Sequence, residues 1–262
     1  MWSYRHRHFT VHQLPALRDN YVYLIDLHDD ATLVAVDPAD AAVVNGACAQ
    51  LGKPLTHIFN THHHWDHTDG NRALQAHFQC RVIGNRADQA RIPGIDWPVT
   101  PDTPPRFGPC VTTLFDLPGH TIGHIALLID DALFCGDTLF GAGCGRIFEG
   151  TPAQMWQSLT ILAALPPTTQ IYCAHEYTLP NLHFARTIEP QSEAIRSRLI
   201  ADKASRRAHR PTIPSSLASE LVTNPFLRPR DSRFCRDYAG AHQIDSDPLT
   251  IFTHIRQRKD HF

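Results

Sequence analysis

The chain has 262 residues, of which 42% are hydrophobic and 19% charged, ordinary values for a soluble globular protein. Its formal net charge is −2, so no overall field favours nucleic acid or a membrane surface as a partner. Seven cysteines without a CxxC pair favour reduced thiols, and we expect a cytoplasmic protein with neither a secretory signal nor a membrane span. The 18 histidines matter most, because histidine is the commonest metal ligand.

The first two thirds of the chain alternate short apolar runs with helical patterns. Strands are expected at 9–14, 21–27, 32–37, 55–60, 81–84, 111–117, 125–130, 132–136 and 171–175. Helices are expected at 39–51, ending at Gly52, at 70–78 and at 153–164. This interleaving predicts a layered α/β domain.

The character of the sequence changes after residue 175. Residues 181–209 are charged and permissive for helix, and residues 250–262 predict a basic helix. We therefore expect two domains, a catalytic domain over 1–175 and a mainly helical domain over 176–262.

A cluster of ligand-type side chains follows the predicted strand at 55–60. It reads Thr61-His62-His63-His64-Trp65-Asp66-His67. In an extended segment, residues 62 and 64 point the same way, so both imidazoles can reach one metal ion. Asp66 and His67 follow where the chain turns and can reach a second ion nearby. The alternative is a solvent-exposed histidine-rich loop.

Three more polar residues each close an apolar strand, namely His120, Asp137 and His175. Any one of them alone would more often be a helix cap or a satisfied core histidine. Together with the cluster at 62–67, they predict a metal site built on strand ends, where a rigid scaffold holds ligands open to substrate.

The HxHxDH motif at 62–67, with the later His, Asp and His, resembles the metallo-β-lactamase superfamily. The resemblance implies an α/β fold, the four-layer αβ/βα sandwich of that superfamily, here with a small C-terminal helical domain. It also implies that one metal ion is held by His62, His64 and His120, that the other is held by Asp66, His67 and His175, and that Asp137 bridges both.

Such a donor set suits catalysis by two metal ions. One shared carboxylate leaves room for a water between two cations, which lower its pKa enough to supply hydroxide at about pH 7 and polarise a carbonyl. Nitrogen and carboxylate donors suit zinc, iron or manganese. We expect two divalent ions, zinc before iron or manganese.

Longer segments match one branch of the superfamily. They span nearly the whole chain and read LRDNYVYLI, THHHWDHTDG, LPGHTIGH, FCGDTLF, GAGCGRIFEGT, CAHEYTLPN, TNPFLR and RQRKDHF. These segments resemble glyoxalase II, the hydroxyacylglutathione hydrolases. The resemblance implies that a hydroxide bridging two metal ions hydrolyses the thioester of S-(2-hydroxyacyl)glutathione. With S-D-lactoylglutathione this yields D-lactate and glutathione, the second step of methylglyoxal detoxification.

The same resemblance assigns glutathione contacts to Arg146, Tyr177, Arg256 and Lys259. Arginine suits a carboxylate because its planar fork binds bidentately. The alternative for Arg256 and Lys259 is a solvated face of the terminal helix. Some family members carry lysine and tyrosine where this chain has Arg146 and Phe148, so we expect weaker or differently distributed glutathione contacts.

Four further residues in or near these motifs are not expected to take part in catalysis. His63 should face away from the metal ions by alternation, and His124 is expected to be structural or to support a ligand. Asp69 is predicted to cap the helix at 70–78. Cys144 has no assignable activating base, so turn packing is expected for it.

Other functions fit the sequence less well. Another hydrolase or thioesterase of the superfamily is the main alternative, although the segment after 176 argues against a lactamase. A one-iron sulfur oxygenase would lack second-site ligands that are present here. A nucleic-acid-binding member is disfavoured by the net charge, and a structural metal site by the open coordination expected. The expected partner is a small molecule, the protein a monomer, without nucleic acid or membrane.

Overall fold

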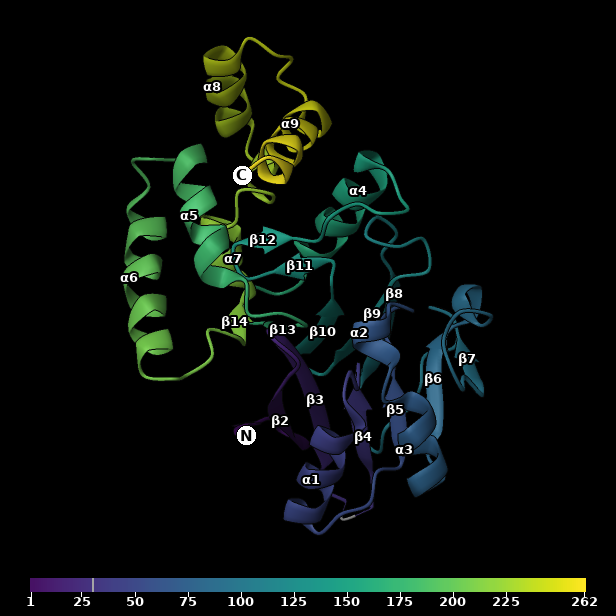
Figure 1. The fold of residues 1–262 in the computed structure, drawn as a ribbon. Coiled ribbons are helices and arrows are strands. Elements are labelled where there is room, and N and C mark those ends of the chain that lie inside the picture. Colours follow the sequence, from purple (N-terminus) through teal and green to yellow (C-terminus); the bar gives the residue numbers. More distant parts are fainter. Residues whose placement is uncertain (30) are drawn as a thin grey trace. The chain divides into compact units, whose positions relative to one another are not determined.

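The computed structural model describes residues 1–29 and 31–262, which form two compact units. Unit 1 comprises Met1–Asp116 and Gly123–Gly136, and unit 2 comprises Leu117–Ile122 and Asp137–Phe262. Figure 1 labels most of their helices and strands. The domain division predicted from the sequence, 1–175 and 176–262, stays a prediction.

Unit 1 contains most of the strands. They are β1 (Trp2–Arg5), β2 (Phe9–Ala16), β3 (Asn20–Leu27), β4 (Leu33–Val36), β5 (His57–Phe59), β6 (Arg81–Asn85), β7 (Trp97–Val99), β8 (Thr112–Asp116), β9 (Ile125–Ile129) and β10 (Ala132–Gly136). Its helices are α1 (Ala41–Leu51), α2 (Trp65–Thr68), α3 (Asn71–Phe78) and the 3₁₀ turn η1 (Arg86–Asp88).

Strands β1 to β7 form one sheet in chain order. Pairing is antiparallel from β1 to β4 and parallel from β4 to β7. Strands β8, β9 and β10 pair antiparallel in a second sheet. Because β4 and β5 run parallel, their carboxyl ends lie at the same edge of the first sheet, and this edge carries Asp37 and the 61–67 cluster.

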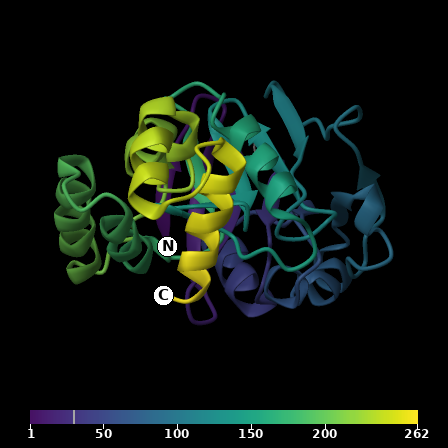
Figure 2. The ribbon, with the colours of Figure 1, turned by 90° about the horizontal axis from the view of Figure 1, so that it is seen from above.

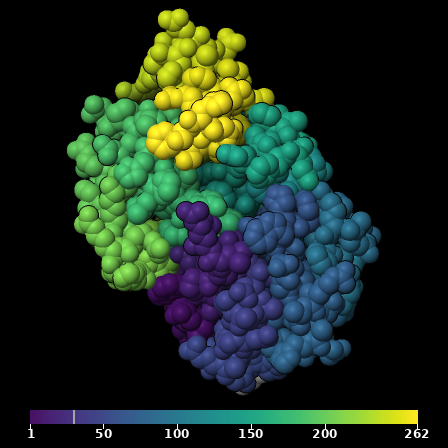
Figure 3. All heavy atoms as spheres, viewed as in Figure 1, coloured from purple at the N-terminus to yellow at the C-terminus, as the bar shows by residue number. Residues whose placement is uncertain are grey.

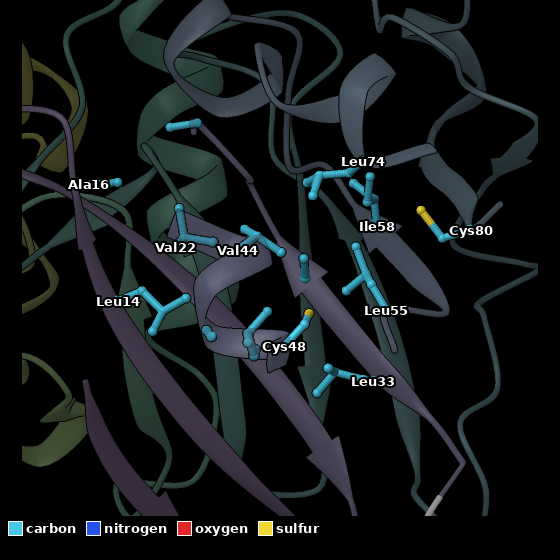
Figure 4. Packing of buried hydrophobic residues seen from close by; sticks show 14 of the residues in the cluster. Leu14, Ala16, Val22, Leu33, Val44, Cys48, Leu55, Ile58, Leu74 and Cys80 are labelled. Atoms are coloured by element: carbon cyan, nitrogen blue, oxygen red, sulfur yellow. The ribbon is translucent and has the colours of Figure 1, made fainter. Parts of the chain in front are cut away.

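Helix α1 packs its buried residues Val44 and Cys48 onto the first sheet, as Figure 4 shows. Facing them are Leu14, Val22 and Ile58 from the strands. Gly52 ends α1 in a left-handed conformation, at φ 66°, where glycine carries no steric penalty. The predicted helix end at Gly52 is confirmed.

Unit 2 is mainly helical. Its helices are α4 (Pro152–Leu162), α5 (Thr178–Ile188), α6 (Glu193–Arg207), α7 (Leu217–Thr223), α8 (Ser232–His242), α9 (Pro248–Asp260) and the 3₁₀ turn η2 (Arg228–Arg230). Its short strands are β11 (Leu139–Phe140), β12 (Gly143–Cys144), β13 (Gln170–Cys173) and β14 (Ser215–Ser216). Figure 2 shows α8 and α9, in yellow tones, side by side.

The helix-permissive segment 181–209 is helical in two pieces. Helix α5 ends at Ile188 because Pro190 disfavours helical backbone at Glu189, which adopts φ −126° and ψ 76°. Helix α6 restarts after Ser192, whose side chain accepts a hydrogen bond from the Ile195 N–H. The basic helix predicted at 250–262 corresponds to α9.

The prediction that Asp69 caps the helix after it is wrong. Asp69 has helical backbone, with φ −63° and ψ −29°, and ends α2. The N-cap of α3 is Gly70, without a side-chain cap bond. A capping side chain reaches the first free N–H groups from an extended backbone, which Asp69 lacks.

In the described part of the chain, no helix has the length and apolar character needed to cross a membrane.

A buried carboxylate holds unit 2 together. Glu220 is fully buried and accepts hydrogen bonds from the Arg198 guanidinium at 2.7 Å, the Ser215 hydroxyl at 2.6 Å and the Ala142 N–H at 2.8 Å. The ion pair of Arg198 on α6 with Glu220 on α7, together with the bond from Ala142, joins both helices to the turn between β11 and β12. A buried charge in such a network is costly to leave uncompensated.

We expect Glu220→Ala to lower the free energy of unfolding by about 3–5 kcal/mol, because the buried Arg198 guanidinium loses its nearer carboxylate and keeps Asp202, at 3.3 Å. Chemical denaturation measures this. The matched control is Glu193→Ala, which removes a solvent-exposed pair with Arg196 and should cost less than about 1 kcal/mol. Equal effects of the two substitutions would contradict the structural role of Glu220.

Candidate metal and substrate site

Unit 1 brings together the four ligand-type residues of the 61–67 cluster. Nε2 of His62 lies 3.0 Å from Nδ1 of His64, as expected for alternate residues of an extended segment. Helix α2 then turns the chain so that Nε2 of His67 lies 3.6 Å from Oδ2 of Asp66. The His62 and His67 rings are 4.0 Å apart, centre to centre.

Asp37, which sequence analysis did not single out, orients this cluster. It follows β4 and accepts hydrogen bonds from the Thr61 N–H at 2.8 Å and the Thr61 hydroxyl at 2.7 Å. Its Oδ2 also lies 3.0 Å from Nδ1 of His67. A carboxylate only accepts, so Nδ1 of His67 carries the proton, and Nε2 offers its lone pair. The sequence feature that could have identified Asp37 is its position as the last residue of the predicted strand at 32–37.

Unit 2 brings together His120, Asp137 and His175, the three residues predicted to close apolar strands. The two carboxylate oxygens of Asp137 face different histidines. Oδ2 lies 3.4 Å from Nε2 of His120, and Oδ1 lies 3.4 Å from Nε2 of His175. Nδ1 of His120 bonds the Arg146 carbonyl at 2.7 Å, which fixes the proton there and leaves Nε2 as an acceptor. The Asp137 carboxylate thus presents one oxygen to each of two imidazole rings.

The ligand-type residues of unit 1 and those of unit 2 both have the chemistry and the spacing that a divalent metal ion requires. Metal bonds of about 2.0–2.1 Å in a tetrahedral site place ligand atoms about 3.3 Å apart. The ligand atoms named above lie 3.0 to 3.6 Å apart within their own unit. Imidazole lone pairs fixed by partners at the other ring nitrogen are typical of metal ligands.

A pocket of about 270 Å³ opens beside the unit 2 ligands. Its lining consists of His120, Asp137, Phe140, Cys144, Arg146, Phe148, Tyr177, Asn181, Arg256 and Lys259. It therefore joins two of the metal-type ligands to all four predicted glutathione contacts. The Tyr177 ring stacks on the His175 ring at 4.7 Å. Figure 3 shows atoms of the C-terminal helix, in yellow, at the surface.

The cations of this pocket differ in exposure. Arg256 is buried and donates to the Cys144 carbonyl at 3.1 Å and to Asp260 at 3.0 Å. Arg146 is largely exposed, with Nε 3.7 Å from Asp260. The ammonium group of Lys259 lies over the Phe184 ring, 5.2 Å from its centre. Burial, and then the charge of Arg256, lower the pKa of Lys259.

The residues without an expected catalytic role have other partners. Nδ1 of His63 lies 3.2 Å from Oδ2 of Asp88, and the His124 ring stacks on His62 at 4.9 Å. Burial raises the pKa of the Cys144 thiol to about 11, so it carries no thiolate at neutral pH. This agrees with turn packing in place of nucleophilic chemistry.

Two family models match the chain. Residues 17–110 match the metallo-beta-lactamase superfamily, and residues 176–262 match the hydroxyacylglutathione hydrolase C-terminus. A hydroxyacylglutathione hydrolase of Rhodospirillum rubrum is 45% identical, over 96% of this chain and 98% of its own length. The chain belongs to the hydroxyacylglutathione hydrolase family. A second member, from Methylococcus capsulatus, is 48% identical over 95% of this chain and 97% of its own length.

The solved structures agree with the family on the fold. ETHE1 from Myxococcus xanthus superposes with a TM-score of 0.65 at 25% identity, over 95% of this chain and 97% of that one. The predicted metallo-β-lactamase fold with a C-terminal helical domain of the hydroxyacylglutathione hydrolases is therefore confirmed. The predicted enzyme class is confirmed with the family.

Proposed function

We propose that this protein hydrolyses the thioester of S-(2-hydroxyacyl)glutathione, with S-D-lactoylglutathione as the first substrate to test. The observation that carries the proposal is the unit 2 pocket, whose lining includes the ligand-type residues His120 and Asp137 and the cations Arg146 and Lys259. Full-length similarity to hydroxyacylglutathione hydrolases supports the same substrate class.

We propose that the protein binds two divalent metal ions and that Asp137 is a ligand of both. Zinc is our first choice, and iron or manganese suit the same donors. When bound, the ions would supply a bridging hydroxide and polarise the thioester carbonyl. The assignment is His62, His64 and His120 for one ion, and Asp66, His67 and His175 for the other.

The other residues of the chain would bind and orient the substrate. Glutathione carries two carboxylates, for which Arg146 and Lys259 offer charge-assisted hydrogen bonds. Arg256 would act mainly by holding α9 against the Cys144 carbonyl. Tyr177 would present its phenol at the pocket wall. A thiolate leaves without a strong general acid, so no further proton donor is required of the chain.

We further propose that residues 1–175 act as the catalytic domain and 176–262 as the substrate-binding domain, which agrees with the family match at 176–262. We propose that the protein acts in the cytoplasm. The reaction would be the second step of methylglyoxal detoxification. All seven cysteines are free thiols, which suits a reducing compartment that supplies glutathione. A monomer remains our prediction.

Phe148 offers a test of the pocket by gain of function. The residue is 61% exposed and lines the pocket, and its ring centre lies 5.2 Å from that of His120. Phe148→Tyr adds a hydroxyl at the position where other family members carry a phenol, and should lower KM by about threefold to tenfold through one new hydrogen bond. Steady-state kinetics with S-D-lactoylglutathione measure this. Phe148→Leu, without a hydroxyl, is the control and should not lower KM.

Metal dependence tests the proposed mechanism. Hydrolysis of S-D-lactoylglutathione should disappear after dialysis against a chelator and return with zinc, iron or manganese. Elemental analysis of the active protein should find about two ions per chain. Full turnover by metal-free protein would contradict the mechanism. Two bound ions without turnover would keep the metal site and redirect the search to other esters, thioesters or lactams.

A further inference from the structure

A second group of ligand-type side chains lies within unit 1. An imidazole nitrogen of His8, the Cys110 sulfur and a carboxylate oxygen of Asp130 lie within 4.8 Å of one another. Nδ1 of His8 is 2.7 Å from Oδ2 of Asp130, a hydrogen bond that an ion held by both residues would replace. None of the three belongs to the ligand sets or to the pocket described above, so the proposed hydrolysis leaves the group unexplained.

Backbone hydrogen bonds hold these three segments in place. The Asp130 N–H donates to the Val111 carbonyl at 2.9 Å, and the Val111 N–H donates to Oδ1 of Asp130 at 3.0 Å. The His8 carbonyl accepts from the His28 N–H at 3.0 Å. The residue before β2, the loop before β8 and the turn after β9 are thus preorganised, which is what a metal site requires of its supporting backbone.

One of the three residues lines a pocket, and two carboxylates act on the sulfur. The pocket, of about 150 Å³, is lined by Arg7, His8, Leu27, His28, Asp29 and Pro109, the neighbour of Cys110. The His8 and Asp130 side chains remain 28% and 17% exposed. Burial, followed by the carboxylates of Asp130 and Asp29, raises the pKa of the Cys110 thiol to about 11. Both carboxylates create a negative potential at the sulfur that a divalent ion would neutralise.

We propose that His8, Cys110 and Asp130 bind a further divalent cation of the zinc class, apart from the ions of the hydrolytic site. One nitrogen, one sulfur and one oxygen donor suit such a borderline-soft ion, with water in the fourth position. On binding, the Cys110 S–H bond breaks, a sulfur–metal bond forms and the proton passes to solvent, without oxidation or reduction. The ion would join three segments of unit 1 that are distant in sequence.

Cobalt(II) is the probe, because a cobalt–thiolate bond gives a charge-transfer absorption that imidazole and carboxylate ligands do not. Protein already loaded with two zinc ions per chain is titrated with cobalt(II). One further equivalent should produce the band in the natural protein, and turnover should stay unchanged. Cys110→Ser should abolish the band, and His8→Ala should weaken cobalt binding by at least about tenfold. Cys235→Ser, a thiol outside the group, is the matched control and should keep it.

A natural protein that takes up no third equivalent with a thiolate band overturns the proposal, as does a band that survives Cys110→Ser. Should Cys110→Ser fail to fold, His8→Ala decides, because His8 is partly exposed and its removal leaves the core intact. Either result leaves the hydrolytic site untouched, since the proposed ligands of that site include no cysteine.

Discussion

Replacing Asp137 by asparagine should lower kcat/KM for S-D-lactoylglutathione by about a thousandfold or more and should reduce the bound metal below two ions per chain. The physical reason is that each Asp137 oxygen faces a different histidine, His120 or His175, at 3.4 Å. An amide keeps the shape, removes the negative charge and turns one of the two acceptors into a donor.

The control for this substitution is Asp102→Asn, which neutralises an exposed carboxylate outside the ligand sets and should change neither turnover nor metal content. Steady-state kinetics and elemental analysis on the same preparations supply both readouts. Asp137→Asn protein that retains two ions and full turnover would contradict the bridging role, and with it the assignment of the unit 2 ligands.

Lys259→Ala should raise KM by roughly tenfold to a hundredfold with little change in kcat, because a charge-assisted hydrogen bond is worth about 1.5–3 kcal/mol. A contact made equally in the ground state and the transition state affects binding and not the chemical step. Arg258→Ala is the matched control on the same helix. Arg258 donates to the Tyr238 hydroxyl at 3.1 Å and does not line the pocket, so its loss should leave KM unchanged.

The lowered pKa of Lys259 adds a pH signature to this prediction. An ammonium group with a pKa below its ordinary value of 10.5 loses its charge earlier as the pH rises. The inhibition constant of the product glutathione should therefore increase with pH before 10.5 is reached. In Lys259→Ala protein this part of the pH dependence should be absent. Identical profiles for both proteins would return Lys259 to a surface role.

The sequence predicted that ligand-type residues gather within each unit, because each of them follows an apolar run. His120, Asp137 and His175 each follow an apolar run, and alternation alone places His62 and His64 on one side. The within-unit geometry agrees with both expectations. The ends of strands can be predicted from the sequence because the apolar run that forms a strand also shows where the strand stops.

Other features depend on tertiary packing and could not be read in the same way. Asp37 orients His67 from a parallel neighbouring strand, and the sequence does not reveal which strands pair. Arg256 looks like one more surface charge of a basic helix, yet it is buried against the Cys144 carbonyl. We therefore expect Arg256→Ala to lower stability as well as affinity, which makes Lys259 the cleaner probe of substrate binding.

The proposed cleavage of an acyl-glutathione thioester can be measured with two substrates. Metal-loaded protein is compared on S-D-lactoylglutathione and on the D-lactoyl thioester of N-acetylcysteamine, which has the same acyl group and lacks the glutathione carboxylates. We predict rapid release of glutathione from the first and a kcat/KM lower by at least about a hundredfold for the second. Equal rates on both would contradict glutathione recognition, and no cleavage of either by protein with both ions bound would contradict the proposed activity.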